Sequence, residues 1–287
     1  MNATLLLTMF CLLVLSISST DDKSGKTASA ELRVMSFNIR NDNPDDGEHN
    51  WKYRKPRVAE VLSFHQPDVA GFQEVYANQL ADLETMMPGY DHVGVGRTDG
   101  KADGEFAPIF FNTKRLELVD QGTFWLSPTP DKVGSVGWDA NLERIATWAR
   151  LRDKQTGQTT LAMNTHFDHA GEQARTESAK LILEQLNALA GEDPVILTGD
   201  FNATPDSDAF ATLSSKLTDA RSAADTTLGP AETFGGFEPG SAKPVRIDYV
   251  WTSPALAVRR FATLSMHWNG KHASDHFPVM ADVVLAK

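Results

Sequence analysis

The chain has 287 residues, and 41% of them are hydrophobic, which is enough to build the core of one large domain. Its formal net charge of −11 argues against a protein that binds nucleic acid through a broad basic face. A nuclease is not excluded, because bound divalent cations and a local basic rim can hold a phosphate.

Residues 5–17 form an apolar run that is short for a membrane span and has the length of the hydrophobic region of a signal peptide. No Lys or Arg precedes it, and the polar residues 18–30 follow it. The only cysteine, Cys11, falls inside the run, so the cleaved chain has no disulfide, no thiolate nucleophile and no cysteine-based zinc site. We therefore predict a signal peptide and polar linker over residues 1–30, a catalytic domain over residues 31–287, no stable membrane span, and a secreted or periplasmic location.

Strand-like and helix-like segments alternate from residue 32 onward without a linker or an internal repeat. In chain order the patterns predict a strand at 32–37, a polar loop at 41–53, a helix at 56–64 with Pro56 in its first turn, a strand at 68–72, a helix at 79–87, strands at 107–111, 116–119, 146–151 and 160–164, a helix at 175–189, a strand from Val195, a helix at 208–213, and strands at 245–251, 258–265 and 278–285.

Polar residues with useful chemistry fall where the predicted strands end. Asp200 and Asn202 follow the apolar run that starts at Val195, and residues two apart in an extended chain point the same way. Asp275 and His276 come after a polar loop and just before the last strand. In layered α/β proteins such side chains gather into one site, because the sheet holds the loops at its edge rigidly.

Hydrolysis of a phosphoester needs a nucleophilic water, stabilisation of charge on the phosphoryl oxygens and help for the leaving oxygen. Asn38, Glu74 and Asp275 offer hard oxygen ligands, which suit Mg²⁺ or Mn²⁺ better than zinc. His276 is a candidate general base, and Asp248 is the carboxylate that would fix its tautomer.

Three more residues complete the predicted chemistry. His166 is a candidate general acid or donor to a phosphate oxygen, and Asp200 and Asn202 could align the water or a second cation. Each of these residues, taken alone, has an ordinary structural role as an alternative, such as a turn, a helix cap or a hydrogen-bonded histidine. Their joint occurrence in this order supports the catalytic interpretation.

With these motifs, the chain resembles the endonuclease/exonuclease/phosphatase superfamily, which has the deoxyribonuclease I-like fold. The resemblance covers residues 32–285 and rests on six short motifs, at residues 36–40, 72–74, 164–166, 199–202, 246–250 and 274–276. It implies an α/β fold that is a four-layer αββα sandwich, dependence on Mg²⁺ (or Mn²⁺), and hydrolysis of phosphoesters. It also implies the same cation-binding, base, water-positioning and phosphate-contacting roles for the residues named above.

Two departures from the family's apurinic-site endonucleases argue against DNA repair. Arg40 stands where those enzymes carry an acidic residue, and His166 stands where they carry a tyrosine. The stretch from Thr165 to Arg175 instead resembles a bacterial, largely uncharacterised branch of the superfamily.

Arginines near strand ends can clamp a phosphate bidentately, so Arg40, Arg144 and Arg175 are predicted substrate contacts, with ion pairing in the fold as the equal alternative. Trp268 lies in the loop before Asp275 and is predicted to stack on a base or a sugar ring of the substrate.

We therefore predict a secreted, monomeric, divalent-metal-dependent phosphoesterase, most consistent with a phosphodiester hydrolase, that acts on nucleic acid, a phospholipid headgroup or a sugar phosphate. Three alternatives stay open. They are an extracellular nuclease proper, a non-catalytic binding module, and a zinc metallo-β-lactamase-like hydrolase suggested by the two histidines of Thr165-His-Phe-Asp-His169.

Overall fold

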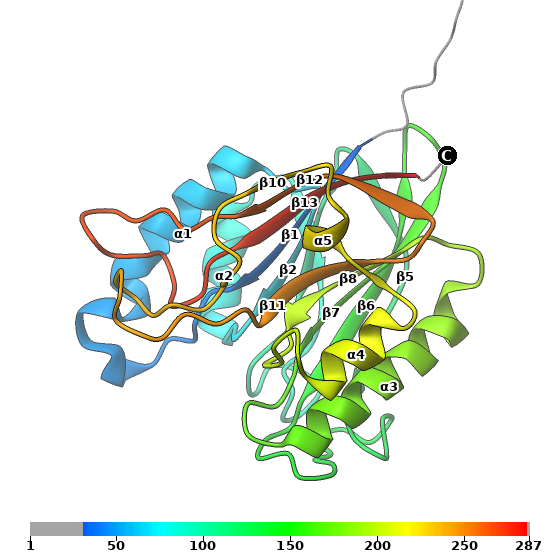
Figure 1. Ribbon diagram of the computed structural model, residues 1–287, viewed down its shortest axis with the longest axis horizontal. Coiled ribbons are helices and arrows are strands. Elements are labelled where there is room, and N and C mark those ends of the chain that lie inside the picture. Colours follow the sequence, from blue (N-terminus) through cyan, green and yellow to red (C-terminus); the bar gives the residue numbers. More distant parts are fainter. Residues whose placement is uncertain (1–30, 286–287) are drawn as a thin grey trace, which may run out of the picture.

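Two β-sheets packed face to face form the centre of the computed structural model, which describes residues 31–285 (Figure 1). The predicted signal peptide lies outside the described residues. The first sheet has seven strands, in the spatial order β10 (Thr226–Leu228), β12 (Leu256–Thr263), β13 (Val279–Leu285), β1 (Leu32–Asn38), β2 (Val69–Gln73), β4 (Ile109–Asn112) and β3 (Tyr90–Val93). The second sheet has six, in the order β5 (Leu116–Trp125), β6 (Ile145–Asp153), β7 (Thr159–His166), β8 (Val195–Asp200), β11 (Asp248–Thr252) and β9 (Thr218–Asp219).

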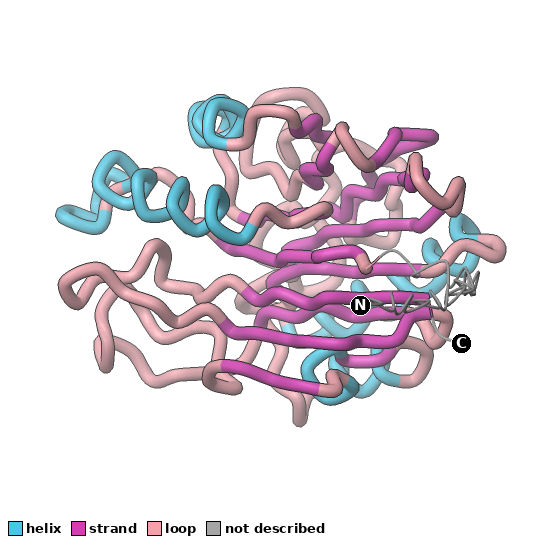
Figure 2. Tube along the Cα trace, turned by 90° about the horizontal axis from the view of Figure 1, so that it is seen from above, coloured by secondary structure: helices cyan, strands magenta, loops and turns pink. Residues whose placement is uncertain are grey.

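Helices cover the outer face of each sheet (Figure 2). Helices α1 (Trp51–His65) and α2 (Ala77–Met86) pack on the seven-stranded sheet, and α3 (Glu172–Ala190) and α4 (Asp208–Ser214) pack on the six-stranded sheet. A short 3-10 helix, η1 (Pro44–His49), precedes α1, and the four-residue α5 (Ala220–Ala223) follows β9. The order of layers is therefore helix, sheet, sheet, helix, which confirms the predicted four-layer sandwich.

The space between the two sheets is filled mainly by aliphatic side chains. These side chains are fully or almost fully buried, and they include Val34, Val69, Ile109, Val250 and Val283. Since the central strands are buried on both faces, they read as nearly continuous apolar runs rather than as alternating ones. This is why the sequence alone could locate these strands.

A buried polar bridge crosses this apolar layer. The Asn164 side chain of β7 accepts a hydrogen bond from Gln73 of β2 at 2.7 Å and from Thr198 of β8 at 3.0 Å. Its amide nitrogen donates to the backbone carbonyls of Phe72 and Pro108 at 2.7 and 3.1 Å. Because buried polar groups are costly when unpaired, this network favours one register of one sheet on the other.

Several element boundaries differ from the sequence predictions. The helix expected at 56–64 begins at Trp51, where the Asn50 side chain accepts a hydrogen bond from the Lys52 backbone, so Pro56 lies inside the helix rather than in its first turn. The strand expected at 116–119 continues to Trp125 as β5. The short strands β3, β9 and β10 were not predicted, because they are held by pairing with distant strands rather than by their own pattern. Every helix within residues 31–285 is too short or too polar to cross a bilayer.

Gly71 makes the polar bridge possible, and replacing it tests the bridge. A Cβ atom at this position would lie 2.2 Å from the Thr198 hydroxyl and 2.4 Å from the Asn164 amide oxygen. We expect Gly71→Ala to destabilise the protein by about 3 kcal/mol through overpacking, measured by urea unfolding. Gly270→Ala is the control, because its Cβ meets no atom within 4 Å and only the left-handed backbone (φ 80°) opposes it, which costs about 1 kcal/mol. Equal losses in the two variants would contradict the bridge as a packing constraint.

Candidate active site

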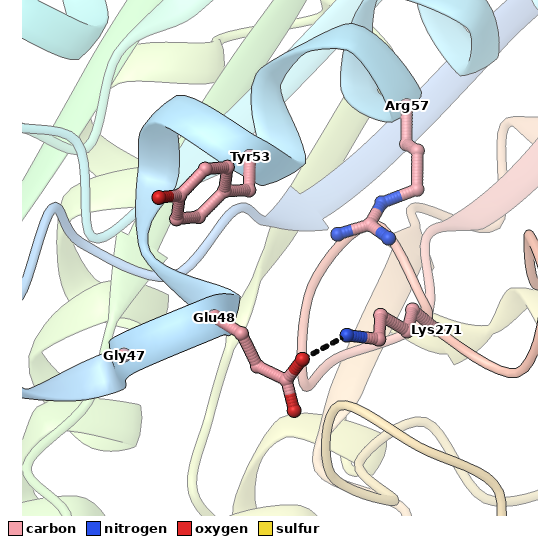
Figure 3. A pocket seen from close by; sticks show the side chains of 5 residues that line it. All are labelled: Gly47, Glu48, Tyr53, Arg57 and Lys271. Atoms are coloured by element: carbon pink, nitrogen blue, oxygen red, sulfur yellow. Dashed lines mark hydrogen bonds and ion pairs between the residues drawn. The ribbon is translucent and has the colours of Figure 1, made fainter.

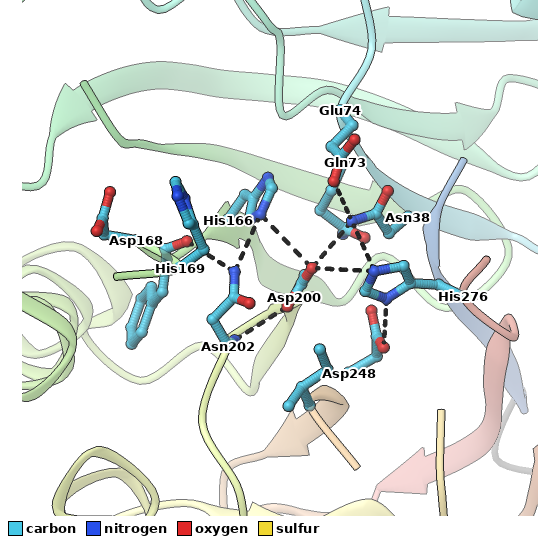
Figure 4. Close-up of polar contacts among 12 residues, drawn as sticks. Asn38, Gln73, Glu74, His166, Asp168, His169, Asp200, Asn202, Asp248 and His276 are labelled. Carbon is cyan, nitrogen blue, oxygen red and sulfur yellow. Dashed lines mark hydrogen bonds and ion pairs between the residues drawn. The ribbon is translucent and has the colours of Figure 1, made fainter. Parts of the chain in front are cut away.

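The ends of four central strands meet at one edge of the sandwich. Strands β1 and β2 run parallel in one sheet, and β7 and β8 run parallel in the other, so their carboxyl ends deliver Asn38, Glu74, His166 and Asp200 to the same region (Figure 4). Strand β11 runs antiparallel to β8 and places Asp248 directly opposite Asp200. The structure thus brings together five of the residues that the sequence singled out.

His276 lies between two of these carboxylates. Its Nδ1 is 2.9 Å from Asp248 Oδ2, and its Nε2 is 3.7 Å from Asp200 Oδ2. Thr233 donates a second hydrogen bond to Asp248 Oδ2 at 2.6 Å. Burial by itself lowers the pKa of His276, but the charges of Asp248 and Asp200 outweigh burial and raise it well above its usual range. Burial and the facing Asp248 in turn raise the pKa of Asp200 to about 7.

Asn38 acts in this structure as a donor toward the carboxylates. Its Nδ2 is 3.0 Å from Glu74 Oε1 and 2.9 Å from Asp200 Oδ2, while its Oδ1 accepts the Arg40 backbone N–H at 2.9 Å. The sequence analysis assigned the amide oxygen to a cation. Here that oxygen is occupied by the backbone, because the chain turns sharply after β1.

Glu74 and Asp275 form the acidic wall of the site. Glu74 accepts the Asn41 backbone N–H at 3.1 Å and lies 3.7 Å from Arg40 Nη1. Burial would raise the pKa of Glu74, but His276 and the hydrogen bond from Asn38 hold it below its usual value. Burial raises the pKa of Asp275, and the Glu74 charge raises it further.

Three residues of the site have a left-handed backbone although they are not glycines. These are Arg40 (φ 58°), Glu74 (φ 59°) and Asn202 (φ 46°). Each lies one or two residues after the end of a strand, where the chain must turn to present its side chain. Such conformations cost roughly 1 kcal/mol or more and gather at functional sites.

His166 belongs to the opposite, cationic wall. Asn202 Nδ2 lies 3.2 Å from His166 Nε2 and also donates to the Phe167 carbonyl, and Asp200 Oδ2 lies 3.5 Å from the same ring nitrogen. Nδ1 faces Glu105 Oε2 at 3.9 Å. Burial first, and then the charges of Arg144 and Arg97, lower the pKa of His166 well below its usual value. His166 is therefore neutral.

Glu105 and Arg97 were not identified from the sequence. They form a buried ion pair at 2.7 Å, and Glu105 also accepts from Asn41. Burial, followed by the Glu74 charge, raises the pKa of Glu105. A β-bridge between Val75 and Phe106 carries Glu105 beside Glu74. This contact joins distant segments, so no local pattern could have indicated it.

The predicted arginines occupy different positions. Arg40 clamps Asp46 with its Nε and Nη2 and reaches Glu74 with Nη1, so it lies at the site and is also an ion-pair partner. Arg144 is buried, 3.4 Å from Asp168, and its Nη1 has no partner. Arg175 lies on α3 and donates to the backbone carbonyl of Asp168 at 3.1 Å.

Trp268 does not reach the catalytic cluster. Its indole N–H donates to Glu60 of α1 at 2.7 Å, and its ring packs against the core under α1 and α2. The loop after β12 turns toward α1, which the position of Trp268 in the sequence could not indicate. The structure therefore gives Trp268 a packing partner in place of the predicted substrate contact.

Arg54 of α1 holds the loops around the site together. Its guanidinium is fully buried and donates to the backbone carbonyls of His49, Ile39, Arg40 and Ala273, with Asn41 at the longest distance, 3.4 Å. Burial lowers the pKa of Arg54 to about 10. No carboxylate pairs with it among the described residues, so it is a positioning residue for the chain after β1 and the segment before Asp275.

A divalent cation fits the donor set of this site. Ligand atoms of Glu74, Asp200 and His276 all lie within 4.8 Å of one another, and Asp275 adds a carboxylate beside Glu74. Several carboxylates buried together repel one another, and a hard cation relieves that repulsion. The oxygen-rich set suits Mg²⁺ or Mn²⁺.

Comparison with known proteins assigns the family. A family model described as the Endonuclease/Exonuclease/phosphatase family matches residues 35–276. The chain belongs to this family. Its members hydrolyse phosphoester bonds and generally use a divalent metal, so the chain is a hydrolase of phosphoesters. The predicted superfamily is confirmed.

The most similar solved structures include two bacterial proteins. An endonuclease/exonuclease/phosphatase from Bacteroides vulgatus is 42% identical, with a TM-score of 0.86 over 90% of this chain and 100% of that one. A mannosyl-6-phosphatase from Bacteroides thetaiotaomicron is 39% identical, with a TM-score of 0.86 over 88% of this chain and 100% of that one. Among curated proteins, nocturnin of Drosophila melanogaster is 25% identical over 64% of this chain. The matched region covers only 30% of the length of nocturnin.

The zinc metallo-β-lactamase-like alternative is wrong. The family match excludes it, and the described residues hold no three-ligand cluster among His166, Asp168 and His169. Asp168 instead accepts the backbone N–H groups of Ala170 and Gly171 at 3.0 and 2.8 Å. The motif is a turn that precedes α3, and the first N–H groups of that helix, those of Gln173 and Ala174, donate to Asp139.

Arg54→Met tests the positioning role of Arg54. The variant leaves several buried carbonyls without a donor, each of which costs about 1–3 kcal/mol. We expect a stability loss of at least about 3 kcal/mol in urea unfolding and, at a temperature where the variant is folded, a lower kcat with little change in KM. Lys52→Met on the exposed side of α1 is the control. A purely structural role would leave kcat of the folded variant unchanged.

Asp168→Asn tests the turn that holds Arg144. Burial raises the pKa of Asp168, but the N–H groups of Gly171 and Ala170 and the Arg144 charge lower it more, so the net shift is downward from 3.8. A carboxyl group whose pKa is lowered by folding stabilises the folded state at pH values above its ordinary pKa. This contribution to stability is lost as the pH falls through the pKa of the folded state. We expect the variant to be about 2 kcal/mol less stable at pH 7, with the difference shrinking below pH 3.8 in urea titrations. A difference that is independent of pH would contradict the charged contact.

Proposed function

We propose that this chain is a divalent-metal-dependent phosphoester hydrolase in which His276 activates water, and that its substrate is a sugar phosphate monoester. The observation that carries the proposal is the buried pair of Asp248 and His276, whose ring presents Nε2 to Asp200 and Asn38 beside Glu74 (Figure 4). Such a pair serves general base catalysis, because one nitrogen is fixed by the carboxylate and the other is free to take a proton.

The reaction follows from the positions of the chain's own residues. Asp248 accepts the Nδ1 hydrogen of His276, which leaves Nε2 as the acceptor for a proton of the attacking water. Asp200, 3.7 Å from Nε2, is placed to orient that water. The carboxylates raise the pKa of His276, and the positive charge of a divalent cation bound beside it would oppose that rise and favour the neutral ring that accepts the proton.

The phosphate would lie between the acidic and the cationic wall. A cation bound by Glu74 and Asp275 would neutralise charge on the phosphoryl oxygens. On the other side, Arg144 offers its buried Nη1, which has no partner within residues 31–285, and the buried ring of His166 lies 3.5 Å from Asp200. Preorganised donors of this kind are effective because they need no reorganisation when charge develops.

The proposed substrate class rests on the similarity to the Bacteroides thetaiotaomicron mannosyl-6-phosphatase, which extends over nearly the whole chain. This similarity favours a phosphate monoester on a sugar over the diester that the sequence alone suggested. The net charge of −11 agrees with a small substrate rather than a long polyanion.

Hydrolysis assays with purified protein test the proposal. We expect turnover of mannose 6-phosphate and p-nitrophenyl phosphate that is abolished by EDTA and restored by Mg²⁺ or Mn²⁺ but not by Zn²⁺. His276→Ala should lower kcat about a thousandfold, whereas His267→Ala, in an exposed loop, should not change it.

Other outcomes of this assay favour the alternatives. Faster cleavage of bis-p-nitrophenyl phosphate would support a phosphodiesterase, and faster cleavage of RNA or DNA would support a nuclease. The absence of turnover with every metal and substrate would contradict the proposal and support a non-catalytic binding module.

We also propose that the protein is exported, because the apolar run at residues 5–17 has the length of a signal sequence. The mass of the protein recovered from the native cell envelope or medium tests this. Loss of an N-terminal segment ending near Ser18 would support export, and an intact N-terminus in the cell interior would contradict it.

A further inference from the structure

A pocket lies at the start of α1, between this helix, η1 and the loop that carries Lys271 (Figure 3). It has a volume of about 430 Å³ and is lined by Gly47, Glu48, Tyr53, Arg57 and Lys271. This size falls within the range of small-molecule sites. Its walls come from η1, the first turns of α1 and the loop that leads to Asp275.

Arg57 is a cation without a partner. Among residues 31–285 it makes no ion pair, and its Nε and Nη2 are buried and donate no hydrogen bond. Burial lowers the pKa of Arg57, and no carboxylate opposes that shift. A guanidinium in this state is stabilised by any oxyanion that reaches it.

The nearby Arg40 shows what the same edge of a guanidinium can bind. Its Nε and Nη2 hold the two oxygens of Asp46 at 3.1 and 2.9 Å. On Arg57 these two nitrogens have no such oxygens. The edge therefore has the geometry for two oxygens of one anion.

Lys271 supplies a second positive charge on the opposite wall. It pairs with Glu48, and the two side chains are 32% and 66% exposed. An ion pair this exposed contributes only about 0–1 kcal/mol, so a ligand can compete for Lys271 while Glu48 turns to water. Glu48 is the single carboxylate among the five lining residues, which leaves the pocket with a net positive charge in an acidic chain.

We propose that this pocket is a binding site for a phosphate group. Nε and Nη2 of Arg57, which are buried in this structure, take two of its oxygens when the side chain turns into the pocket, and Lys271 takes a third. A tetrahedral phosphate offers three such oxygens and up to two negative charges, whereas a carboxylate offers two oxygens and one charge. Tyr53, which is 54% exposed, forms the side of the pocket against which the group carrying the phosphate packs.

The pocket shares its walls with the catalytic centre. Asp46 of η1 holds Arg40, and Arg40 lies 3.7 Å from Glu74. Lys271 belongs to the loop that continues into Asp275. The phosphate has two sources: a second phosphate of a multiply phosphorylated substrate, which rests on the proposed function, or free inorganic phosphate acting as an effector.

Calorimetric titration of inorganic phosphate into the full-length protein tests the site directly. The titration is run in EDTA at constant ionic strength, on wild type, Arg57→Gln and Lys271→Gln. We expect each variant to bind phosphate at least tenfold more weakly than wild type. Arg259→Gln, which removes an exposed arginine of β12 that pairs with Asp225, is the matched control and should bind as wild type does.

Two results would overturn the proposal. One is equal phosphate affinity in wild type and both pocket variants, and the other is acetate binding to the pocket as tightly as phosphate. Within residues 31–285 Arg57 makes no ion pair and its Nε and Nη2 donate no hydrogen bond, so Arg57→Gln breaks no polar contact of these atoms and unfolding of the variant is not expected. Lys271→Gln gives an independent reading. Turnover of p-nitrophenyl phosphate by wild type is recorded separately, so that failure of the proposed function leaves the binding result readable.

A kinetic comparison separates the two sources of the phosphate. The KM values of glucose 6-phosphate and glucose 1,6-bisphosphate are compared between wild type and Arg57→Gln. If Arg57→Gln raises the KM of the bisphosphate only, the pocket binds the second phosphate of the substrate. KM values unchanged for both, together with weakened binding of inorganic phosphate, assign it to the free anion.

Discussion

The active site depends on a buried hydrogen-bonded contact between the two sheets, in which the side chain of Asn164 accepts from Gln73 and donates to the carbonyls of Phe72 and Pro108. Each sheet alone delivers only half of the catalytic residues, because Glu74 ends a strand of one sheet and Asp200 ends a strand of the other. An apolar interface by itself tolerates sliding, since dispersion contacts have little directional preference. The amide bridge has only one satisfied arrangement, and that arrangement sets the distances across the catalytic cluster.

Electrostatics divides the site into two sides that differ in sign. The Asp248 and Asp200 carboxylates face each other from adjacent strands, an arrangement that is unfavourable until His276 stands between them. On the other side, burial and then the charges of Arg144 and Arg97 lower the pKa of His166 well below its usual value. A doubly charged phosphate and its cation therefore meet complementary charges that the fold has already brought together.

The sequence predicted the architecture and most of the cluster because both depend on local signals. Apolar runs identify the central strands, and polar residues such as Asp200 mark the ends of those strands. Glu105 escaped prediction because it reaches the site only through a bridge formed by its neighbour Phe106, and the orientation of the Asn38 amide depends on a turn that the pattern does not encode. Trp268 shows the converse: its place before Asp275 in the chain does not give it a place beside Asp275 in space, because the loop turns toward α1.

The left-handed backbone at Arg40, Glu74 and Asn202 has a consequence for how this enzyme can be engineered. Glycine at these positions would relieve the local conformational penalty, so a selection for heat resistance alone would tend to remove the side chains that the site needs. Stability and activity therefore pull in opposite directions at these three positions. Thermostable variants should be sought in the helices and loops on the outer layers, where no such conflict exists.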